Sequence, residues 1–584
     1  MLCYFTMRRR FFNVKNSFDS SLNYFSIISL EDNSTISLPT NTSPDLMYNL
    51  NGNDWIQWDY STITLNKDDI LYLKGDNSNG FNALNSSNNF SIKGKVELSG
   101  NIMSLLYKDD FENNNTLPGT YTFCDLFYSC TGIISAKDLI LPATTLTSSC
   151  YYYMFQNCTS LTEAPQLPAT TLANSCYSSM FQNCISLTIA PELPATTLAT
   201  FCYDSMFYGC TGLTSAPELP ATKLITACYN NMFESCTSLT TAPQLPVTIL
   251  AINCYQGMFQ NCTSLTEAPQ LPATKLKSSC YRYMFRNCTS LTTSPQLPAT
   301  TLADSCYSYM FSGCTGLTSA PELPAIILQN WCYDSMFKNC TSLTTAPELP
   351  ATTLASECYK YMFRGCTSLT TSPELPATTL TSKCYQYMFR DCTSLIEAPE
   401  LPATTLVDYC YSNMFQNCTS LTTSPELPAT TLASYCYQSM FNGCSKLNYI
   451  TMLATDISAS SCLNNWVSGV ASTGTFVKHP DMATLPSGSS GIPEGWTVED
   501  YQEINLITFT INDIEYQAEE GMTWEEWVNS EYNTDGYILY SSLNFGDIYD
   551  STMTFMVIYS INESKGVEAL DLIESNHEYS LGLS

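Results

Sequence analysis

Apolar positions recur along this chain with one fixed spacing between residues 150 and 444. Twelve times the sequence reads Cys-Tyr-x-x-Met-Phe-x-x-Cys, and each copy begins 26 residues after the previous one. If the first Cys is position 0, the five named positions fall on one helical arc of about 140 degrees. The pattern predicts a short helix in each copy, with the variable positions 2, 3 and 6 facing outward.

A second phrase links the copies and predicts a strand. The first of these links reads Leu-Thr-Glu-Ala-Pro over residues 161–165. Because proline cannot donate to a ladder, the strand is expected to end at Pro165. Identical units that pack only against their neighbours form a solenoid. The expected fold class is therefore an α/β repeat solenoid, a right-handed array of 26-residue units with one short parallel strand and one short helix each.

The flanking sequences differ from the array in composition. Residues 1–100 are rich in Asn and Ser and contain short alternating runs, which predict a β-sandwich-like N-terminal domain. The solenoid is expected over 101–462, with degenerate terminal units at Phe123–Cys130 and at Cys462. Such atypical end units cover the open ends of a solenoid.

Two further segments follow the array. Residues 463–497 are expected to form a C-terminal cap and linker, and 498–584 a small α+β module. In that module Ile504–Tyr516 predicts a hairpin that turns at Asn512, and Thr523 opens a short predicted helix. From Glu499 onward the chain has 18 acidic residues and one Lys, a net charge of −17. This segment therefore contributes more than half of the net charge of −30 of the whole chain.

Charge and composition limit the possible partners. A net charge of −30 makes nucleic acid an unexpected partner, since phosphate binding needs clustered Lys and Arg. No segment approaches the roughly 20 apolar residues of a membrane helix, so membrane insertion is not expected. The first twelve residues contain Arg8–Arg10 without an apolar stretch behind them, which does not resemble a secretory signal.

The 28 cysteines are mostly the two Cys of each motif. On a helix, residues eight apart would lie roughly 12 Å from each other, beyond the reach of a disulfide. Buried free thiols are favoured, and a disulfide ladder between neighbouring units stays open as the alternative. Eight-residue spacing is not a zinc pattern, and His479 and His577 have no motif around them. No catalytic, cofactor or metal site is expected, and the protein is not expected to be an enzyme.

Variable positions of the motif provide the candidate ligand surface. Between residues 282 and 390 they are enriched in Arg, Lys and aromatic residues, which are common in recognition hot spots. The candidates are Arg282, Tyr283, Arg286, Tyr309, Trp331, Lys338, Lys360, Tyr361, Arg364, Tyr387 and Arg390. The alternative is that these positions vary because nothing packs on them.

The strand side of each unit is a rival surface. It is rich in Thr, and repeated hydroxyls would suit a repetitive glycan. An acidic residue follows the repeat proline in five consecutive units. That row, which would either attract cations or form an ordinary solvated edge, consists of Glu322, Glu348, Glu374, Glu400 and Glu426.

At the residue level the repeat resembles a known family. The run Met-Phe-Gln-Asn-Cys-Thr-Ser-Leu-Thr from Met154 is similar to BspA-like leucine-rich repeats, although 26 residues is longer than their usual unit. The segments Leu98–Tyr107, Gly474–Lys478 and Gly491–Val498 look like parts of proteins from gut Bacteroides and from the phages, crAss-like phages included, that infect them.

That resemblance implies a non-enzymatic adhesin. The expected function is host recognition as a phage tail-fibre or virion protein, which binds a bacterial surface glycan or protein through the repeats. Other virion proteins would be partners, and by analogy with fibres a homotrimer is possible. The alternative is a BspA-like adhesin on the bacterial cell surface that binds host proteins or other bacteria. A structural spacer between the end domains is a further alternative.

Overall fold

The computed structural model describes residues 19–39, 44–82, 88–482, 484–502, 506–511, 514–519, 557–560, 565–567 and 578–582. The chain separates into two compact units, Met1–Glu499 and Asp500–Ser584. The finer boundaries after residues 100, 462 and 497 stay predictions.

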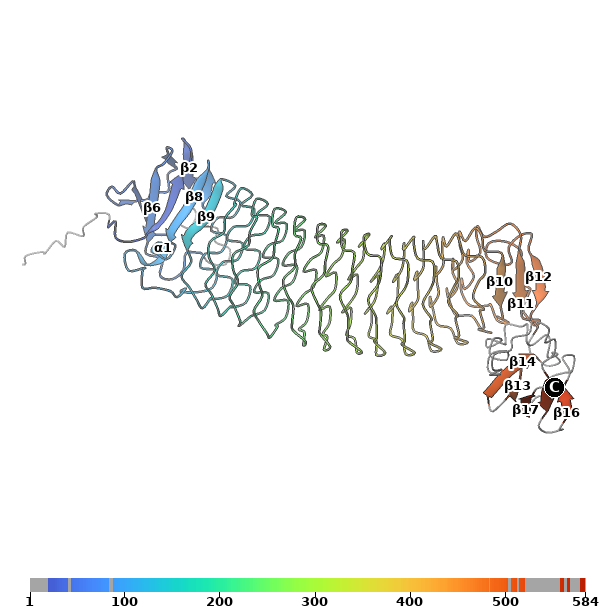
Figure 1. The fold of residues 1–584 in the computed structure, drawn as a ribbon. Coiled ribbons are helices and arrows are strands. Elements are labelled where there is room, and N and C mark those ends of the chain that lie inside the picture. Colours follow the sequence, from blue (N-terminus) through green and yellow to red (C-terminus); the bar gives the residue numbers. More distant parts are fainter. Residues whose placement is uncertain are drawn as a thin grey trace, which may run out of the picture. The chain divides into compact units, whose positions relative to one another are not determined.

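Two sheets form the N-terminal part of the first unit (Figure 1). The six-stranded sheet has the order β4-β3-β6-β1-β8-β9, and the three-stranded sheet has the order β5-β2-β7. In chain order the strands are β1 (Phe25–Ser29), β2 (Ser34–Ser37), β3 (Leu46–Leu50), β4 (Ile56–Gln57), β5 (Ile63–Leu65), β6 (Ile70–Gly75), β7 (Ser91–Lys93), β8 (Val96–Asn101) and β9 (Ile133–Ile140). One short helix, α1 (Ser104–Tyr107), lies between β8 and β9 in sequence.

The larger sheet continues directly into the repeats. Strand β9 pairs in parallel with β8, and Ser135 of β9 bridges Glu163 of the first regular copy. Phe127, which precedes the array, stacks on Phe155 with ring centroids 5.2 Å apart. The first coil of the array therefore packs on a sheet edge and an apolar surface that the preceding N-terminal part provides.

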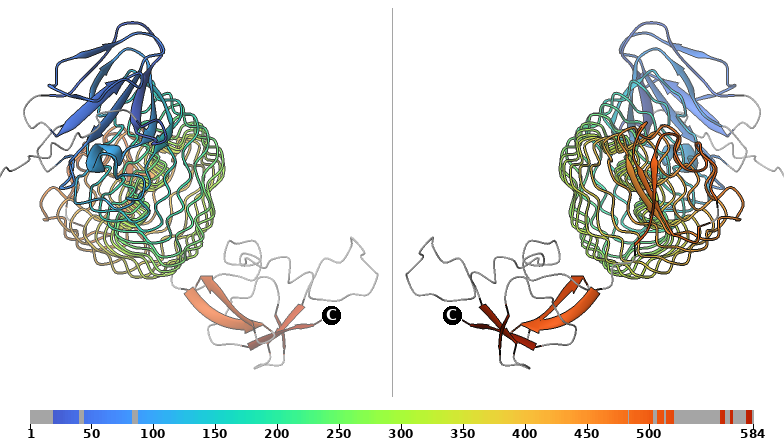
Figure 2. Two further views of the ribbon diagram at one scale, coloured as in Figure 1. Left: turned by 90° about the vertical axis from the view of Figure 1, so that its left-hand side faces the viewer. Right: turned by 90° about the vertical axis from the view of Figure 1, so that its right-hand side faces the viewer.

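Each 26-residue unit forms one coil, and the coils superimpose when viewed end-on (Figure 2). The motif that was expected to be helical is a run of consecutive turns, so that prediction is wrong. Its N–H groups alternate between two kinds of acceptor. Met154 N–H donates to Tyr151 O within the coil (3.2 Å), whereas Phe155 N–H donates to Met180 O of the next coil (2.9 Å). A helix would use both of these donors internally and leave neighbouring coils without backbone bonds.

A left-handed residue at every fourth position makes this run of turns possible. In the first copy these residues are Ser149 (φ 54°), Tyr153 (φ 57°) and Asn157 (φ 61°). The period of four still buries positions 0, 1, 4, 5 and 8 of the motif, as the sequence predicts. A period of four and a helical period of 3.6 differ too little over nine residues to be told apart by burial.

Two aromatic ladders fill the core of the coils. Equivalent rings of successive motifs are nearly parallel, as for Phe207 and Phe233 (5.6 Å, 2°) and for Tyr385 and Tyr411 (5.8 Å, 1°). The Phe ladder ends against Trp466, whose centroid lies 6.2 Å from that of Phe441. The buried apolar area of these ladders stabilises the array, together with the buried Leu, Met and Cys side chains of each unit.

The strand of each unit is much shorter than expected. The linking phrase makes single parallel bridges to the next coil, such as Ser319 to Thr345, and a second row of bridges includes Thr379 to Thr405. The two prolines of each phrase, such as Pro373 and Pro376, lie between the two rows of bridges, where they cannot donate and keep the ladders short. The array is therefore a repeat solenoid with minimal strands and no helices among its described residues.

Motif cysteines are buried as free thiols in the structure. The second Cys of each motif donates to the Phe carbonyl of the preceding coil, for example Cys184 to Phe155 O (3.2 Å) and Cys288 to Phe259 O (3.0 Å). Burial raises the pKa of these thiols, to about 12 at Cys210. The thiol group thus adds a hydrogen bond between coils while it packs as a small apolar side chain.

A parallel pair closes the C-terminal end of the first unit. Strands β10 (Tyr449–Met452) and β11 (Thr475–Lys478) pair in parallel, and β12 (Thr497–Asp500) lies next to β11. The buried Trp466 indole donates to Gly491 O at 2.9 Å. Beyond the coils the core therefore ends in a sheet.

The second unit contains a five-stranded sheet of order β14-β13-β17-β15-β16. Its strands are β13 (Leu506–Ile511), β14 (Ile514–Glu519), β15 (Val557–Ser560), β16 (Lys565–Val567) and β17 (Glu578–Gly582). Strands β13 and β14 are the antiparallel hairpin that the sequence predicts. The helix predicted from Thr523 lies outside the described residues, so the α+β class stays a prediction.

Candidate functional site

The run of turns presents a surface made of side-chain columns, because equivalent residues of successive coils stack. We define the turn face as the residues at motif positions 2, 3, 6 and 7 and the residue just before the motif, position −1. All eleven candidates lie on it, at positions −1, 2, 3 and 6. They do not project freely outward as a helical face would. Ten are half-buried between neighbouring columns, and Trp331 is 43% exposed.

Several aromatic candidates occupy left-handed backbone positions. Tyr283, Tyr309, Tyr361 and Tyr387 have φ between 56° and 61°, and Trp331 has φ 55°. A bulky residue in this region costs roughly 1–2 kcal/mol, which Gly avoids and Asn tolerates better. Most other coils have small or polar residues at motif position 3, such as Ser, Asn or Gly, and Tyr153 of the first copy is a further Tyr there. The large rings are therefore present despite the backbone preference, a kind of strain that is concentrated at functional sites.

The first group of candidates surrounds Tyr283. The guanidinium groups of Arg282 and Arg286 lie 4.6 and 5.4 Å from the Tyr283 ring centroid, and the ring of Tyr309 lies 5.1 Å away. Arg282 also donates to the Tyr283 hydroxyl at 2.8 Å. Arg and Tyr are thus joined in a compact cation–π cluster on two successive coils.

The second group surrounds Tyr361, which stacks on Tyr387 with centroids 4.6 Å apart and planes 10° apart. Three cations lie within 5.7 Å of the Tyr361 centroid: Lys338, Lys360 and Arg364. Lys338 comes from one coil and Lys360 and Arg364 from the next, and with Tyr387 the group extends over three successive coils. The structure therefore brings together residues that the sequence spaces 22 to 26 positions apart.

Carboxylates neutralise part of the second group. Glu357 pairs with Lys360 (2.6 Å) and with Lys383 (3.7 Å), and the Trp331 side chain also hydrogen-bonds to it. Burial acts to raise the pKa of Glu357, but the bond and charge of Lys360 outweigh it and the pKa is lowered. Asp391 lies 3.4 Å from both Arg364 and Arg390.

One carboxylate of the group is almost completely buried. Asp334 is 8% exposed, and burial raises its pKa to about 7 despite the nearby charge of Lys360. An equivalent case in an earlier coil is Glu234, whose pKa burial raises to about 7 while Gln260 donates to it at 2.7 Å. Near neutral pH these two groups are therefore only partly ionised.

Sequence reasoning missed some members of the turn face. Tyr409 and Tyr435 stack with centroids 4.5 Å apart and planes 2° apart, and Lys383 lies 5.9 Å from the Tyr409 centroid. All three occupy position −1, as Trp331 does. A comparison of position −1 across the copies would have found them, because it changes from Ser, Phe, Ala and Asn to larger and charged residues from Trp331 onward.

The two alternative surfaces, the acidic row and the Thr-rich strand side, are exposed. The five Glu of the acidic row are exposed, and within the described residues no group of His, Cys, Asp or Glu is arranged to hold a metal ion. The Thr residues of the bridge rows, such as Thr379 and Thr405, are exposed as well. Neither surface has the interlocked cations and rings of the turn face.

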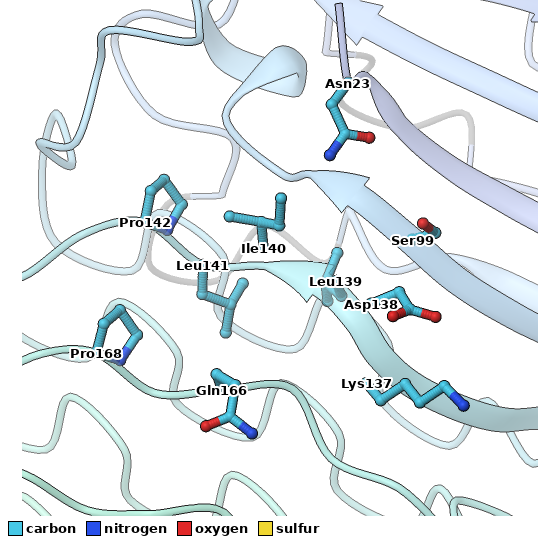
Figure 3. A pocket seen from close by; sticks show the side chains of 10 residues that line it. All are labelled: Asn23, Ser99, Lys137, Asp138, Leu139, Ile140, Leu141, Pro142, Gln166 and Pro168. Carbon is cyan, nitrogen blue, oxygen red and sulfur yellow. The ribbon is translucent and has the colours of Figure 1, made fainter.

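A concave pocket of about 500 Å³ lies elsewhere, where β8 and β9 meet the first coil (Figure 3). Lys137, Asp138 and Gln166 line it, together with Leu139 and prolines of the linking phrases. Lys137 also pairs with Glu163 at 3.5 Å. The pocket contains no residue of the candidate surface. Among the described residues no helix has the length and apolar character needed to cross a membrane.

A comparison with family models identifies the repeat array. The family model of the BspA type leucine rich repeat region matches in overlapping segments that together extend from residue 125 to 466. A leucine-rich repeat protein from Eubacterium ventriosum, solved as a crystal structure, is 13% identical; the alignment covers 74% of this chain and 98% of that chain, with a TM-score of 0.29. A comparison with curated proteins found no match. Since the family model matches more than half of the chain, the protein belongs to the BspA-type leucine-rich repeat family.

Proposed function

We propose that this protein is a non-enzymatic attachment protein whose turn face binds a glycan or protein on a bacterial surface. The observation that carries the proposal is the cluster around Tyr361. Two stacked rings and three cations, which together come from three successive coils, form a pre-arranged recognition surface on an otherwise acidic array. Aromatic and Arg side chains held in place by neighbours lose little entropy on binding, which favours hot spots.

The proposed setting is a phage tail fibre or another virion component. The likeness of several segments to proteins of Bacteroides and their phages supports this setting. Other virion proteins would be the partners of the end domains, with a homotrimer as the assembly by analogy with fibres. In this proposal the protein has no cofactor, and neither nucleic acid nor a membrane is a partner.

The second candidate is a bacterial cell-surface adhesin that binds host proteins or other bacteria. Membership of the BspA-type family favours it, because members of this family are often surface adhesins. Both candidates use the same turn face, and they differ in where the protein is located and in which cell it binds.

Peptide mass spectrometry on purified virions, cell envelope and cytosol of the source culture separates the two settings. Enrichment in virions is the expected result and would direct the search for a ligand to the envelope of the bacterial host. Enrichment in the cell envelope would reject the tail-fibre setting in favour of the adhesin. Enrichment in the cytosol would contradict both.

The binding face is tested with the double variant Tyr361→Ala/Arg364→Ala. We expect adsorption to host cells to weaken at least about tenfold, as for the loss of hot-spot residues. The matched control is Tyr153→Ala/Gln156→Ala, which truncates the same two motif positions in the first copy. Equal adsorption of both variants would move the binding site away from the Tyr361 cluster.

A further inference from the structure

Motif position 6 contains a column of cations that the fold does not require. Lys338, Arg364 and Arg390 occupy this position in three successive coils, and Arg286 occupies it two coils before Lys338. Like charges stacked at the same position of neighbouring coils repel one another. Other coils have an uncharged Gln at this position, for example Gln260, so a neutral side chain fits there.

The column is only partly neutralised by the protein itself. Asp391 is shared between Arg364 and Arg390, 3.4 Å from each. Lys338 makes no ion pair with any described residue. Burial and the charge of Arg364 lower its pKa, and the nearby buried Asp334 offsets them only in part. A bound external anion would reduce the repulsion between these cations. This reduction lowers the free energy of the anion-bound state relative to the free protein.

The rings beside the column suit a sugar chain. Tyr361 and Tyr387 stack next to it, so in these two coils a column of rings runs beside the column of cations, each ring next to the Arg of its own coil. The 4.6 Å between these rings is comparable to the length of one sugar ring. A linear polysaccharide could therefore place one residue near each coil.

We infer that the position-6 column binds an acidic polysaccharide, one with carboxylate or sulfate groups, which lies along the coils with its anions beside Lys338, Arg364 and Arg390. This inference rests on the proposed function and names the class of its ligand. Nucleic acid is disfavoured as the ligand. A duplex has one negative charge per roughly 1.7 Å, so the acidic residues of the rest of the chain repel it while only three cations attract it. A glycan with about one charge per sugar meets far less of that repulsion.

Binding of the full-length protein to defined polymers tests the inference. The probes are polygalacturonate for carboxylates and dextran sulfate for sulfates, with uncharged dextran as the reference polymer. We expect at least one acidic polymer to bind and dextran not to bind. Lys338→Gln should weaken binding about three- to tenfold and reduce the slope of log K against log salt by about one.

The matched control is Lys275→Gln, which removes the same charge from an exposed Lys outside the turn face. Equal loss in both variants would mean general attraction of polyanions and would overturn the inference. Binding of duplex DNA as tight as that of the polymers, with the same loss in Lys338→Gln, would replace the glycan with nucleic acid.

Competition with host cells separates this inference from the proposed function. If cells bind the protein and the acidic polymers do not compete, the proposed function stands and the acidic-glycan inference fails. If no bacterial cell binds the protein, the proposed function itself fails. Competition by an acidic polymer, lost in Lys338→Gln, would support both.

Discussion

The buried carboxyl group of Asp334 links the candidate site to the stability of the coil around it. An ordinary Asp has a pKa of 3.8, and in the folded protein burial raises the pKa of Asp334 to about 7. The folded state therefore holds a proton that the unfolded state has released between these two values. Stability contributed by this group is highest at low pH and falls as the pH rises from about 4 to 7.

Asp334→Asn should remove this pH-dependent loss of folding stability, because Asn has no proton to release. Above pH 7 we expect the variant to be more stable than the parent, by on the order of 2–4 kcal/mol for a pKa shift of about three units. Near pH 4 the two proteins should be about equally stable. Thermal unfolding measured across this pH range checks the expectation.

Asp304→Asn is the control, because it removes an exposed carboxylate from an adjacent coil. If the control gains as much stability at pH 8 as Asp334→Asn does, the gain comes from the lower net negative charge and not from the burial of Asp334. Equal stability of Asp334→Asn and the parent at all pH values would contradict the raised pKa of Asp334.

At the scale of one coil, burial was predictable from the sequence and backbone conformation was not. The Cys, Tyr, Met and Phe positions of each motif are all in the core, because their period of about four gives one apolar side in either conformation. Left-handed positions are marked clearly by Asn or Gly only at position 7, for example Asn157 and Gly313. At Tyr283 or Trp331 a bulky residue conceals the turn.

The candidate site was predictable in composition and only partly in geometry. Variability and the enrichment in Arg and Tyr located the turn face from sequence alone. The ion pairs of Glu357 and Asp391 and the stacking of Tyr409 on Tyr435 depend on the contact between coils. Those contacts follow from the turn conformation, which the helix hypothesis did not contain.

Thiol reactivity tests the hydrogen-bonded cysteines of the coils. In a Cys3→Ser protein, whose remaining cysteines are all described, we expect almost no alkylation under native conditions because burial raises the thiol pKa values. Denaturant should expose all 27 remaining thiols. Thiols counted by mass after alkylation check this.

Fewer labelled thiols after denaturation, restored by a reductant, would indicate the disulfide ladder instead. Rapid labelling of the native protein would show that the coils open readily. Cys124 and Cys462, whose side chains are 9% and 4% exposed whereas those of the coil motifs are fully buried, are the internal comparison and should react first.

For the array as a whole, each coil contacts only its two neighbours, so a complete unit should be removable. Deletion of residues 202–227, one full period, joins coils that already have matching hydrogen-bond partners. We expect a folded protein with unchanged circular dichroism per residue and a slightly lower melting temperature.

Deletion of residues 202–214, half a period, is the matched control. It would place the linking phrase of one coil against the turns of the next and interrupt both aromatic ladders. We expect loss of cooperative unfolding or aggregation. A folded half-period deletion would contradict the nearest-neighbour description of the array.

The fixed period of the coils also has a consequence for inheritance. Near-identical consecutive copies are substrates for unequal recombination in the gene, and any exchange of whole units conserves the register of every ladder and hydrogen bond. Array length can thus change in a single genetic event without a folding penalty at the junction. Each event also changes how many coils separate the Tyr361 cluster from the two end domains. The position of the proposed binding surface along the array is therefore open to rapid selection while its chemistry stays intact.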